Sequence, residues 1–180
     1  MTRYEMSFTG SGGQGVILAS IVFAEAAVLA GMNTVQSQAY GPEARGGLCR
    51  AETILREEEI WYSKVRTPNF LLALTQSSLD HFAPLTAEDA IILADDSLVP
   101  PQGLGARRVY SLPILRAAVE QVGKAMTANI IAVGAINGIL HLFDDEILAE
   151  AVKRHTPAGT EKLNGKALEV GKALAKALPL

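Results

Sequence analysis

The chain has 180 residues, a length that fits one domain able to fold without a metal or disulfide. Its 16 Lys and Arg against 19 Asp and Glu give a net charge of -3 with no block of like charge, so we expect no nucleic-acid partner. The single cysteine, Cys49, excludes an intrachain disulfide and any cysteine-rich iron–sulfur or zinc site.

The beginning of the chain, Met1–Phe8, has no apolar core of signal-peptide length, and we expect a cytoplasmic protein. Two runs, Val16–Ala30 and Ile130–Phe143, are almost uniformly apolar but shorter than the roughly 20 residues that span a bilayer. We expect both to be helices buried on most sides, with no membrane association.

Strands alternate with helices along most of the chain. The expected strands are Tyr4–Thr9, Asn33–Gln38, Leu48–Leu55, Phe70–Leu74, Ala90–Ala94 and Val109–Leu112. The expected helices are Val16–Ala30, one capped by Ser77 or Ser78 that reaches Phe82, Pro113–Val122, Asn129–Phe143, one from Asp144 or Asp145 to Arg154, and one capped by Thr160 that reaches Leu178.

This order predicts an α/β class: a Rossmann-like three-layer single domain over residues 1–180, with a mostly parallel sheet, helices on both faces and a helical C-terminal third. In the run Leu48–Leu55, Arg50 and Glu52 alternate with apolar residues. One face is therefore partly wet, which indicates a place near the sheet edge, where Ile60–Ser63 could pair as a hairpin.

A glycine-rich loop follows the first strand and precedes the first helix, and it satisfies G-x-G-x-x-G. Glycine allows a sharp turn and brings backbone N–H groups close to an anion, and a helix N-terminus adds a partial positive charge. The candidate cofactor-binding residues are Gly10, Gly12, Gly13, Gln14 and Gly15. Tight strand–helix packing is the structural alternative.

A dinucleotide site needs an acidic residue roughly 20 positions on to hold the ribose hydroxyls. The chain has Gln36, Ser37 and Gln38 there, and Glu43 is the first carboxylate beyond them. This disfavours NAD(P) or FAD and favours another phosphate-bearing group.

A second loop, within Gln36–Gly47, carries large functional side chains between glycines and a proline. It follows a strand expected to run parallel to the first, so both loops should lie at one edge of the sheet. Its candidate residues for a substrate, coenzyme A or active-site cavity are Gln38, Tyr40, Gly41, Glu43, Arg45, Gly46 and Gly47.

The two motifs together, Gly10–Gly15 and Ser37–Gly47, resemble the gamma subunit, or the equivalent domain, of the 2-oxoacid:ferredoxin oxidoreductases. The Tyr-Gly-Pro-Glu-Ala-Arg-Gly-Gly sequence of Tyr40–Gly47 is most similar to the 2-oxoglutarate branch. The resemblance extends over essentially the whole chain.

The resemblance implies a multi-subunit enzyme that converts a 2-oxoacid to its acyl-CoA and passes electrons to ferredoxin. Thiamine diphosphate, Mg and iron–sulfur clusters would be held by alpha, beta and possibly delta subunits, and coenzyme A would be a co-substrate. This chain would supply no catalytic residue and would be inactive alone. Arg45 would meet a CoA phosphate or substrate carboxylate, with an ion pair to Glu43 as the alternative.

Other polar residues receive structural interpretations first. Asp95 and Asp96 could serve as acid and base or bind a metal, but such a pair more often begins a loop. The separation of the three histidines argues against a metal site, and His155 fits a helix C-terminus. Asn129 is expected to cap its helix rather than face the ligand.

Two other functions stay open: a self-contained nucleotide- or flavin-binding enzyme, and a purely structural assembly subunit. Because the apolar helices suit a chain that buries area against partners, we expect the isolated protein to self-associate. A monodisperse monomer in light scattering would contradict this.

Overall fold

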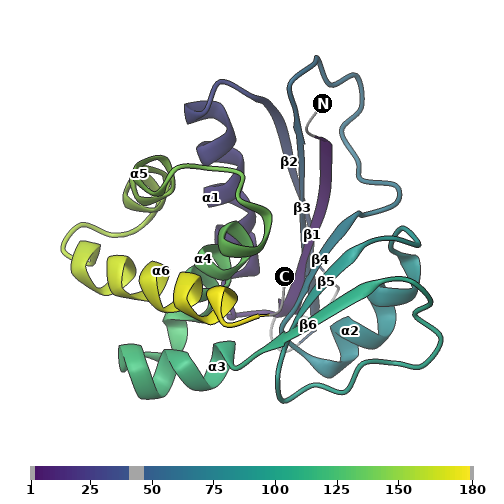
Figure 1. Cartoon of the computed structure of the whole chain (residues 1–180). Coiled ribbons are helices and arrows are strands. Elements are labelled where there is room, and N and C mark those ends of the chain that lie inside the picture. Colours follow the sequence, from purple (N-terminus) through teal and green to yellow (C-terminus); the bar gives the residue numbers. More distant parts are fainter. Residues whose placement is uncertain (1–2, 41–46, 179–180) are drawn as a thin grey trace.

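The computed structural model describes residues 3–40 and 47–178, in which six strands form one mixed sheet of order β2-β3-β1-β4-β5-β6 (Figure 1). The strands are β1 (Arg3–Ser11), β2 (Asn33–Tyr40), β3 (Leu48–Arg56), β4 (Phe70–Ala73), β5 (Ile91–Asp95) and β6 (Arg108–Leu112). Strands β1, β4, β5 and β6 are parallel, and β3 runs antiparallel to both β1 and β2. The predicted α/β class with a mostly parallel sheet is confirmed.

The helical elements cover both faces of the sheet, as predicted. They are α1 (Val16–Leu29), α2 (Gln76–Phe82), α3 (Ile114–Ala117), α4 (Ala128–Leu140), α5 (Asp145–His155) and α6 (Glu161–Lys176), with short helical turns η1 (Ala83–Leu85), η2 (Ala118–Val122) and η3 (Ala125–Thr127). Helix α2 lies on one face of the sheet, and α1, α3 and α4 lie on the other (Figure 1). Helices α5 and α6 pack outside α1 and α4.

The predicted place of β3 near the sheet edge is confirmed, because β3 lies between β1 and the edge strand β2. The predicted hairpin partner is wrong, since Ile60–Ser63 lies in a segment without strand structure. The face of β3 that carries Arg50 and Glu52 is polar because α2 covers β4 and β5 and leaves much of β3 and β2 without a helix. Glu52 and Ile54 on this face are nevertheless buried, so the alternation marked a polar face without a helix rather than a wet one.

The main core lies between the sheet and the helices α1 and α4. Phe23 of α1 packs against Phe8 of β1 and against Phe143, with ring centroids 5.7 Å apart in each pair. Both apolar helices are largely buried in this core, as predicted. Among the helices of residues 3–40 and 47–178, none combines the length and hydrophobicity that a membrane span requires.

Helices α4 and α6 approach each other through glycines. A Cβ added at Gly171 of α6 would overlap the carbonyl oxygen of Ile131, and one at Gly134 of α4 would overlap that of Leu168. The two backbones are therefore in direct contact, which fixes the outer helix against the inner one.

One helix cap differs from the prediction. The N-cap of α2 is Thr75, whose side chain accepts a hydrogen bond from the backbone N–H of Ser78, while the Ser78 hydroxyl accepts one from the N–H of Thr75. Ser78 was identified as a capping residue, but it completes a reciprocal capping box from inside the helix.

Candidate functional site

The glycine loop lies at the switch point of the sheet. Strand β1 leads into α1 on one face, and its neighbour β4 leads into α2 on the opposite face. At such a point the chain leaves the two strands in opposite directions, and α/β sheets generally bind ligands in the crevice beyond the carboxyl ends of these strands. We use the word crevice for this region between the ends of β1 and β4.

Two glycines of this loop are required by its backbone conformation, and a third packs closely against a side chain. Gly13 and Gly15 have φ values of 98° and 74°, a left-handed conformation that glycine adopts without strain. A Cβ at Gly10 would come within 2.5 Å of Oε1 of Gln14. The sequence motif is therefore explained by backbone conformation and close packing, whatever it binds.

The loop also presents backbone donors. Gly12 and Gly13 are exposed, and no residue in the described part of the chain accepts a hydrogen bond from the N–H of Gly13 or Gly15. The first turn of α1, which begins at Val16, adds further N–H groups without helical partners and contains no acidic residue. This arrangement favours an anion.

The side chain of Gln14 joins the two sides of the switch point. Its Oε1 accepts a hydrogen bond from the N–H of Ser11 at 2.8 Å, and its Nε2 donates to the carbonyl oxygen of Leu74, just beyond β4, at 3.2 Å. Gln14 therefore shapes the floor of the crevice through its own amide.

The two loops are neighbours, as predicted. The N–H of Gly12 donates to the carbonyl oxygen of Gly47 at 3.3 Å, and Gly10 pairs with Cys49, which also pairs with Tyr40. Burial raises the pKa of the Cys49 thiol, so this buried cysteine stays protonated below the two loops. Gln38 is exposed on the edge strand β2.

The other residues predicted in the second loop are not placed. Gly41, Glu43, Arg45 and Gly46 lie outside the described residues. Their assignment to the site remains a prediction that rests on the ends of the loop at Tyr40 and Gly47.

Asn129 is not the N-cap residue of its helix, but it fulfils the prediction in part, because its Oδ1 accepts a hydrogen bond at 2.9 Å from the N–H of Ile130 in the first turn. The N-cap position of α4 is Thr127, and the Asn129 side chain turns to the glycine loop, where Nδ2 donates to the Gly15 carbonyl oxygen at 3.3 Å. A Cβ at Gly15 would come within 2.5 Å of this nitrogen. The one signal in the sequence was a polar residue at the start of an apolar helix.

Two residues beside the crevice were not identified from the sequence. Gln76, at the start of α2, forms two hydrogen bonds with the backbone of Val99, at 2.8 and 2.9 Å, and so holds the segment after β5 against α2. Arg50 of β3 lies opposite Thr9 of β1. It forms an ion pair with Glu52, and its guanidinium lies 5.4 Å from the centre of the Phe82 ring. Nothing but the alternation of β3 indicated Arg50.

The aspartates after β5 have structural roles, as the loop interpretation predicted. Asp95 accepts hydrogen bonds from the backbone and hydroxyl of Ser97 and, at 2.7 Å, from the N–H of Leu115. Asp96 forms an ion pair with Arg116.

His155 ends α5, as predicted, and its Nε2 lies 3.4 Å from Oε2 of Glu25. Across residues 3–40 and 47–178, no three potential metal ligands gather in one place.

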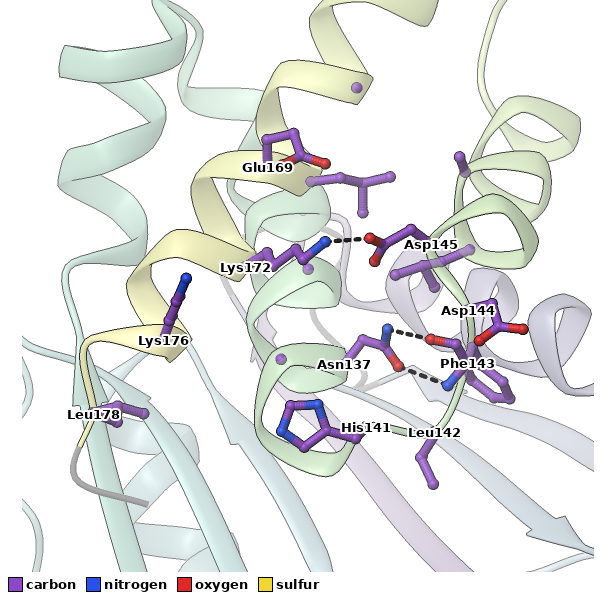
Figure 2. Close-up of a pocket in the computed structure, with 16 residues that line it drawn as sticks. Asn137, His141, Leu142, Phe143, Asp144, Asp145, Glu169, Lys172, Lys176 and Leu178 are labelled. Atoms are coloured by element: carbon purple, nitrogen blue, oxygen red, sulfur yellow. Dashed lines mark hydrogen bonds and ion pairs between the residues drawn. The ribbon is translucent and has the colours of Figure 1, made fainter.

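A pocket of about 790 Å³ lies between α4, α5 and α6, away from both loops (Figure 2). Lys172 and Asp145 form an ion pair across it, and the Asn137 side chain forms two hydrogen bonds with the backbone of Phe143. Charges of both signs line this pocket, and no motif contributes to it. The crevice at the switch point is therefore the better candidate site.

Comparison with known proteins agrees on one family. Residues 5–174 match the family described as pyruvate ferredoxin/flavodoxin oxidoreductase. The 2-oxoglutarate synthase subunit KorC of Methanothermobacter thermautotrophicus is 39% identical over 96% of this chain and 95% of its own length. In the same organism, the ketoisovalerate oxidoreductase subunit VorA is 37% identical over 95% of this chain but only 36% of its own length.

Solved structures show the same fold. The gamma subunit of a keto/oxoacid ferredoxin oxidoreductase from Geobacter sulfurreducens is 36% identical, with a TM-score of 0.86 over 97% of this chain and 99% of that one. A 2-oxoglutarate:ferredoxin oxidoreductase from Magnetococcus marinus, solved with 2-oxoglutarate, coenzyme A and succinyl-CoA, is 20% identical, with a TM-score of 0.87 over 99% of this chain and 32% of that one. At that identity the second likeness concerns the fold alone.

Proposed function

The chain belongs to the pyruvate ferredoxin/flavodoxin oxidoreductase family as a gamma-type subunit of a 2-oxoacid:ferredoxin oxidoreductase, and from this premise we propose that its crevice helps to bind coenzyme A in a 2-oxoglutarate-type complex. The reaction is the oxidative decarboxylation of 2-oxoglutarate to its acyl-CoA, with electrons passed to ferredoxin. The similarity to KorC subunits supports this substrate over pyruvate.

One observation carries the CoA proposal: the glycine loop and the second loop meet at the Gly12–Gly47 hydrogen bond, beside exposed backbone donors and the N-terminus of α1. A CoA phosphate placed there would accept hydrogen bonds from the N–H groups of Gly13 and Gly15. Arg45, three positions before the first residue of β3, would add a charge able to form bidentate contacts.

The remaining chemistry belongs to other subunits in this proposal. Thiamine diphosphate with Mg would be bound by the alpha and beta subunits, and iron–sulfur clusters would be held there or on a delta subunit. This chain has one cysteine, whereas a cluster needs several thiolates. Its own part is to position CoA and to contact the subunits that carry the reacting groups.

The test compares two variants of Gly13 in the reconstituted complex, by calorimetric titration with CoA. A Cβ at Gly13 meets nothing within 4 Å, and Asn and Asp tolerate a positive φ better than other residues, so both variants should fold. Gly13→Asp places a negative charge beside the phosphate and should weaken CoA binding at least about tenfold relative to Gly13→Asn.

Arg45→Ala should also weaken CoA binding, because it removes the proposed partner of a phosphate. Unchanged affinity in both Gly13→Asp and Arg45→Ala would contradict the CoA role and leave the crevice as a contact between protein segments. A screen of 2-oxoacids with ferredoxin or a viologen as acceptor tests the substrate, and preferential turnover of pyruvate would overturn the 2-oxoglutarate assignment.

A further inference from the structure

The segment between β3 and β4, residues 57–69, has no helix or strand and carries the only tryptophan of the chain. Irregular segments of this length are uncommon in compact domains and are usually functional or disordered. We define residues 57–66 as the Trp61 loop. Its tryptophan side chain is 86% exposed.

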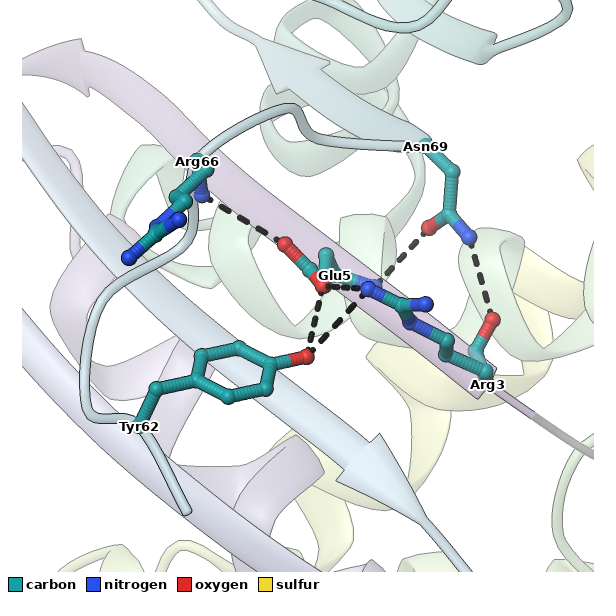
Figure 3. Close-up of polar contacts among 5 residues, drawn as sticks. All are labelled: Arg3, Glu5, Tyr62, Arg66 and Asn69. Atoms are coloured by element: carbon teal, nitrogen blue, oxygen red, sulfur yellow. Dashed lines mark hydrogen bonds and ion pairs between the residues drawn. The ribbon is translucent and has the colours of Figure 1, made fainter. Parts of the chain in front are cut away.

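The Trp61 loop is held at its base by a buried carboxylate (Figure 3). Glu5 of β1, 5% exposed, accepts hydrogen bonds from the Tyr62 hydroxyl at 2.8 Å, the Arg66 N–H at 3.4 Å and the Arg3 guanidinium at 2.6 Å. Burial acts to raise the pKa of Glu5, but the hydrogen bonds from Arg3 and Tyr62 outweigh it, and the pKa lies below its usual value. The Glu5 carboxylate is therefore ionised at neutral pH. We call Glu5, with its hydrogen bonds to Arg3, Tyr62 and Arg66, the clamp of the loop.

Other contacts complete the clamp. Val65 is buried, and the Asn69 side chain accepts from the N–H of Glu5 at 2.9 Å and donates to the carbonyl oxygen of Arg3 at 3.0 Å. The Arg56 guanidinium lies 5.8 Å from the Tyr62 ring centre. These contacts tie the loop to β1 directly after Trp61, while the large apolar side chain of Trp61 itself lies in water.

An exposed tryptophan beside an anchored segment is suited to an interface. A buried aromatic side chain removes roughly 150–250 Å² from water, and tryptophan is enriched among the residues that dominate binding energy. Because the loop is already ordered, a partner would meet little further entropic cost on binding.

The charges beside Trp61 specify the partner. Glu57, Glu58 and Glu59 precede it, whereas Lys64 and Arg66 follow it in the same loop. All five are exposed, and none forms an ion pair with any residue that the structure describes. The three carboxylates lie together on the N-terminal side of Trp61, where a partner has to supply positive charge. The fitting surface is an apolar pocket with Lys or Arg on the side that faces these glutamates.

We propose that Trp61 inserts into such a pocket on another subunit of the oxidoreductase. This rests on the function proposed above, since it requires the complex. The Trp61 loop is anchored at Glu5, about 16 Å along β1 from Gly10, so it is separate from the crevice and can be tested independently. Tyr62 and Glu5 act as positioning residues.

The test uses the single tryptophan as its own probe. The chain is labelled with 5-fluorotryptophan, which gives one ¹⁹F signal, and the solvent isotope shift of that signal is measured in the free chain and in the reconstituted complex. We expect the shift to be lost on assembly. A signal that keeps its full solvent shift in the complex overturns the proposal, and one already shielded in the isolated chain assigns the loop to a second copy and overturns it as well.

Association constants give the second readout. Trp61→Ala should weaken assembly at least about tenfold, whereas Met126→Ala, which truncates another exposed apolar side chain (74% exposed), should leave it unchanged. Replacing Glu57, Glu58 and Glu59 by Gln should reduce the salt dependence of assembly. CoA titration of the same complexes separates the two proposals. If the complex assembles through Trp61 but does not bind CoA, the proposal of a CoA site in the crevice is wrong and the proposal for Trp61 stands.

Discussion

The Gln14 side chain donates a hydrogen bond to the carbonyl oxygen of Leu74 while it accepts one from the backbone N–H of Ser11. One amide thus links the end of β1 to the end of β4 across the point where the sheet reverses its direction of winding. Both a donor and an acceptor are needed for this link, and among side chains of this length only an amide supplies both.

The Gln14 link predicts the effects of two substitutions. Gln14→Glu cannot donate to Leu74 when ionised, so we expect a loss of about 1–2 kcal/mol in the free energy of unfolding, measured in urea, together with weaker CoA binding through the added charge. Gln14→Met keeps the length without a charge and should lose stability while affecting CoA less. If both variants had the same free energy of unfolding as the wild type, the hydrogen bonds of Gln14 would contribute nothing to stability.

Gly15 and Asn129 should behave as a coupled pair. Gly15→Ala adds a Cβ at a φ of 74° and within 2.5 Å of the Asn129 amide nitrogen, so it should destabilise the chain by about 2 kcal/mol or more. Asn129→Ala removes the clash but not the strained φ. In a double-mutant cycle by urea denaturation, we expect the double variant to be more stable than the sum of the single effects predicts. Strict additivity would contradict the contact.

The contact between α4 and α6 predicts opposite effects for two glycines of one helix. Gly171→Ala forces the backbones apart at Ile131 and should lower the free energy of unfolding by about 2–3 kcal/mol. Gly165→Ala, where a Cβ meets nothing within 4 Å, should raise it by about 0.5–1 kcal/mol through helix propensity. Thermal unfolding of the isolated chain measures both, and equal effects would refute the close approach.

Glu5 predicts a pH-dependent loss of stability. Since its pKa is lower in the folded chain than the ordinary value of 4.5, the ionised carboxylate stabilises the fold above that pH, and this contribution is lost as the pH falls through the folded pKa. Glu5→Gln should therefore be less stable than wild type at pH 7, by about 1–2 kcal/mol, and the difference should shrink below about pH 4.5.

Glu88→Gln, at an exposed position, serves as the control for this series and should follow wild type at every pH. The difference in free energy of unfolding between Glu5→Gln and wild type should not stay constant from pH 7 to below about pH 4.5. A constant difference would mean that the contacts of the Trp61 loop do not depend on an ionised Glu5.

Local patterns in the sequence predicted the elements well, because hydrophobic periodicity, glycines and capping residues act within a few positions. The order of the strands depends on pairings between distant segments, which is why the alternation in β3 led to a hairpin with Ile60–Ser63 rather than to its pairing with β1 and β2. Asn129 shows the same limit: its contact with Gly15 joins residues 114 positions apart, and nothing near it in the chain distinguishes such a contact from a cap.

The candidate site was predicted in outline. The glycine loop and the second loop were expected at one edge, and the contact between Gly12 and Gly47 confirms it. The roles inside the site could not be read from residue types, since Gln14 turned out to bridge two strands and Gln76 to hold Val99, each through partners far away in the sequence.

The antiparallel insertion of β3 has a practical consequence for engineering. The second loop leaves the sheet at Tyr40 and returns at Gly47, and both ends are fixed by pairing of Tyr40 with Cys49 and by the hydrogen bond from Gly12. Residues 41–46 can therefore be exchanged as a cassette for those of a relative that acts on another 2-oxoacid, without altering any strand. Calorimetric titration of such chimaeras with CoA would test whether these six positions contribute to the CoA site proposed above.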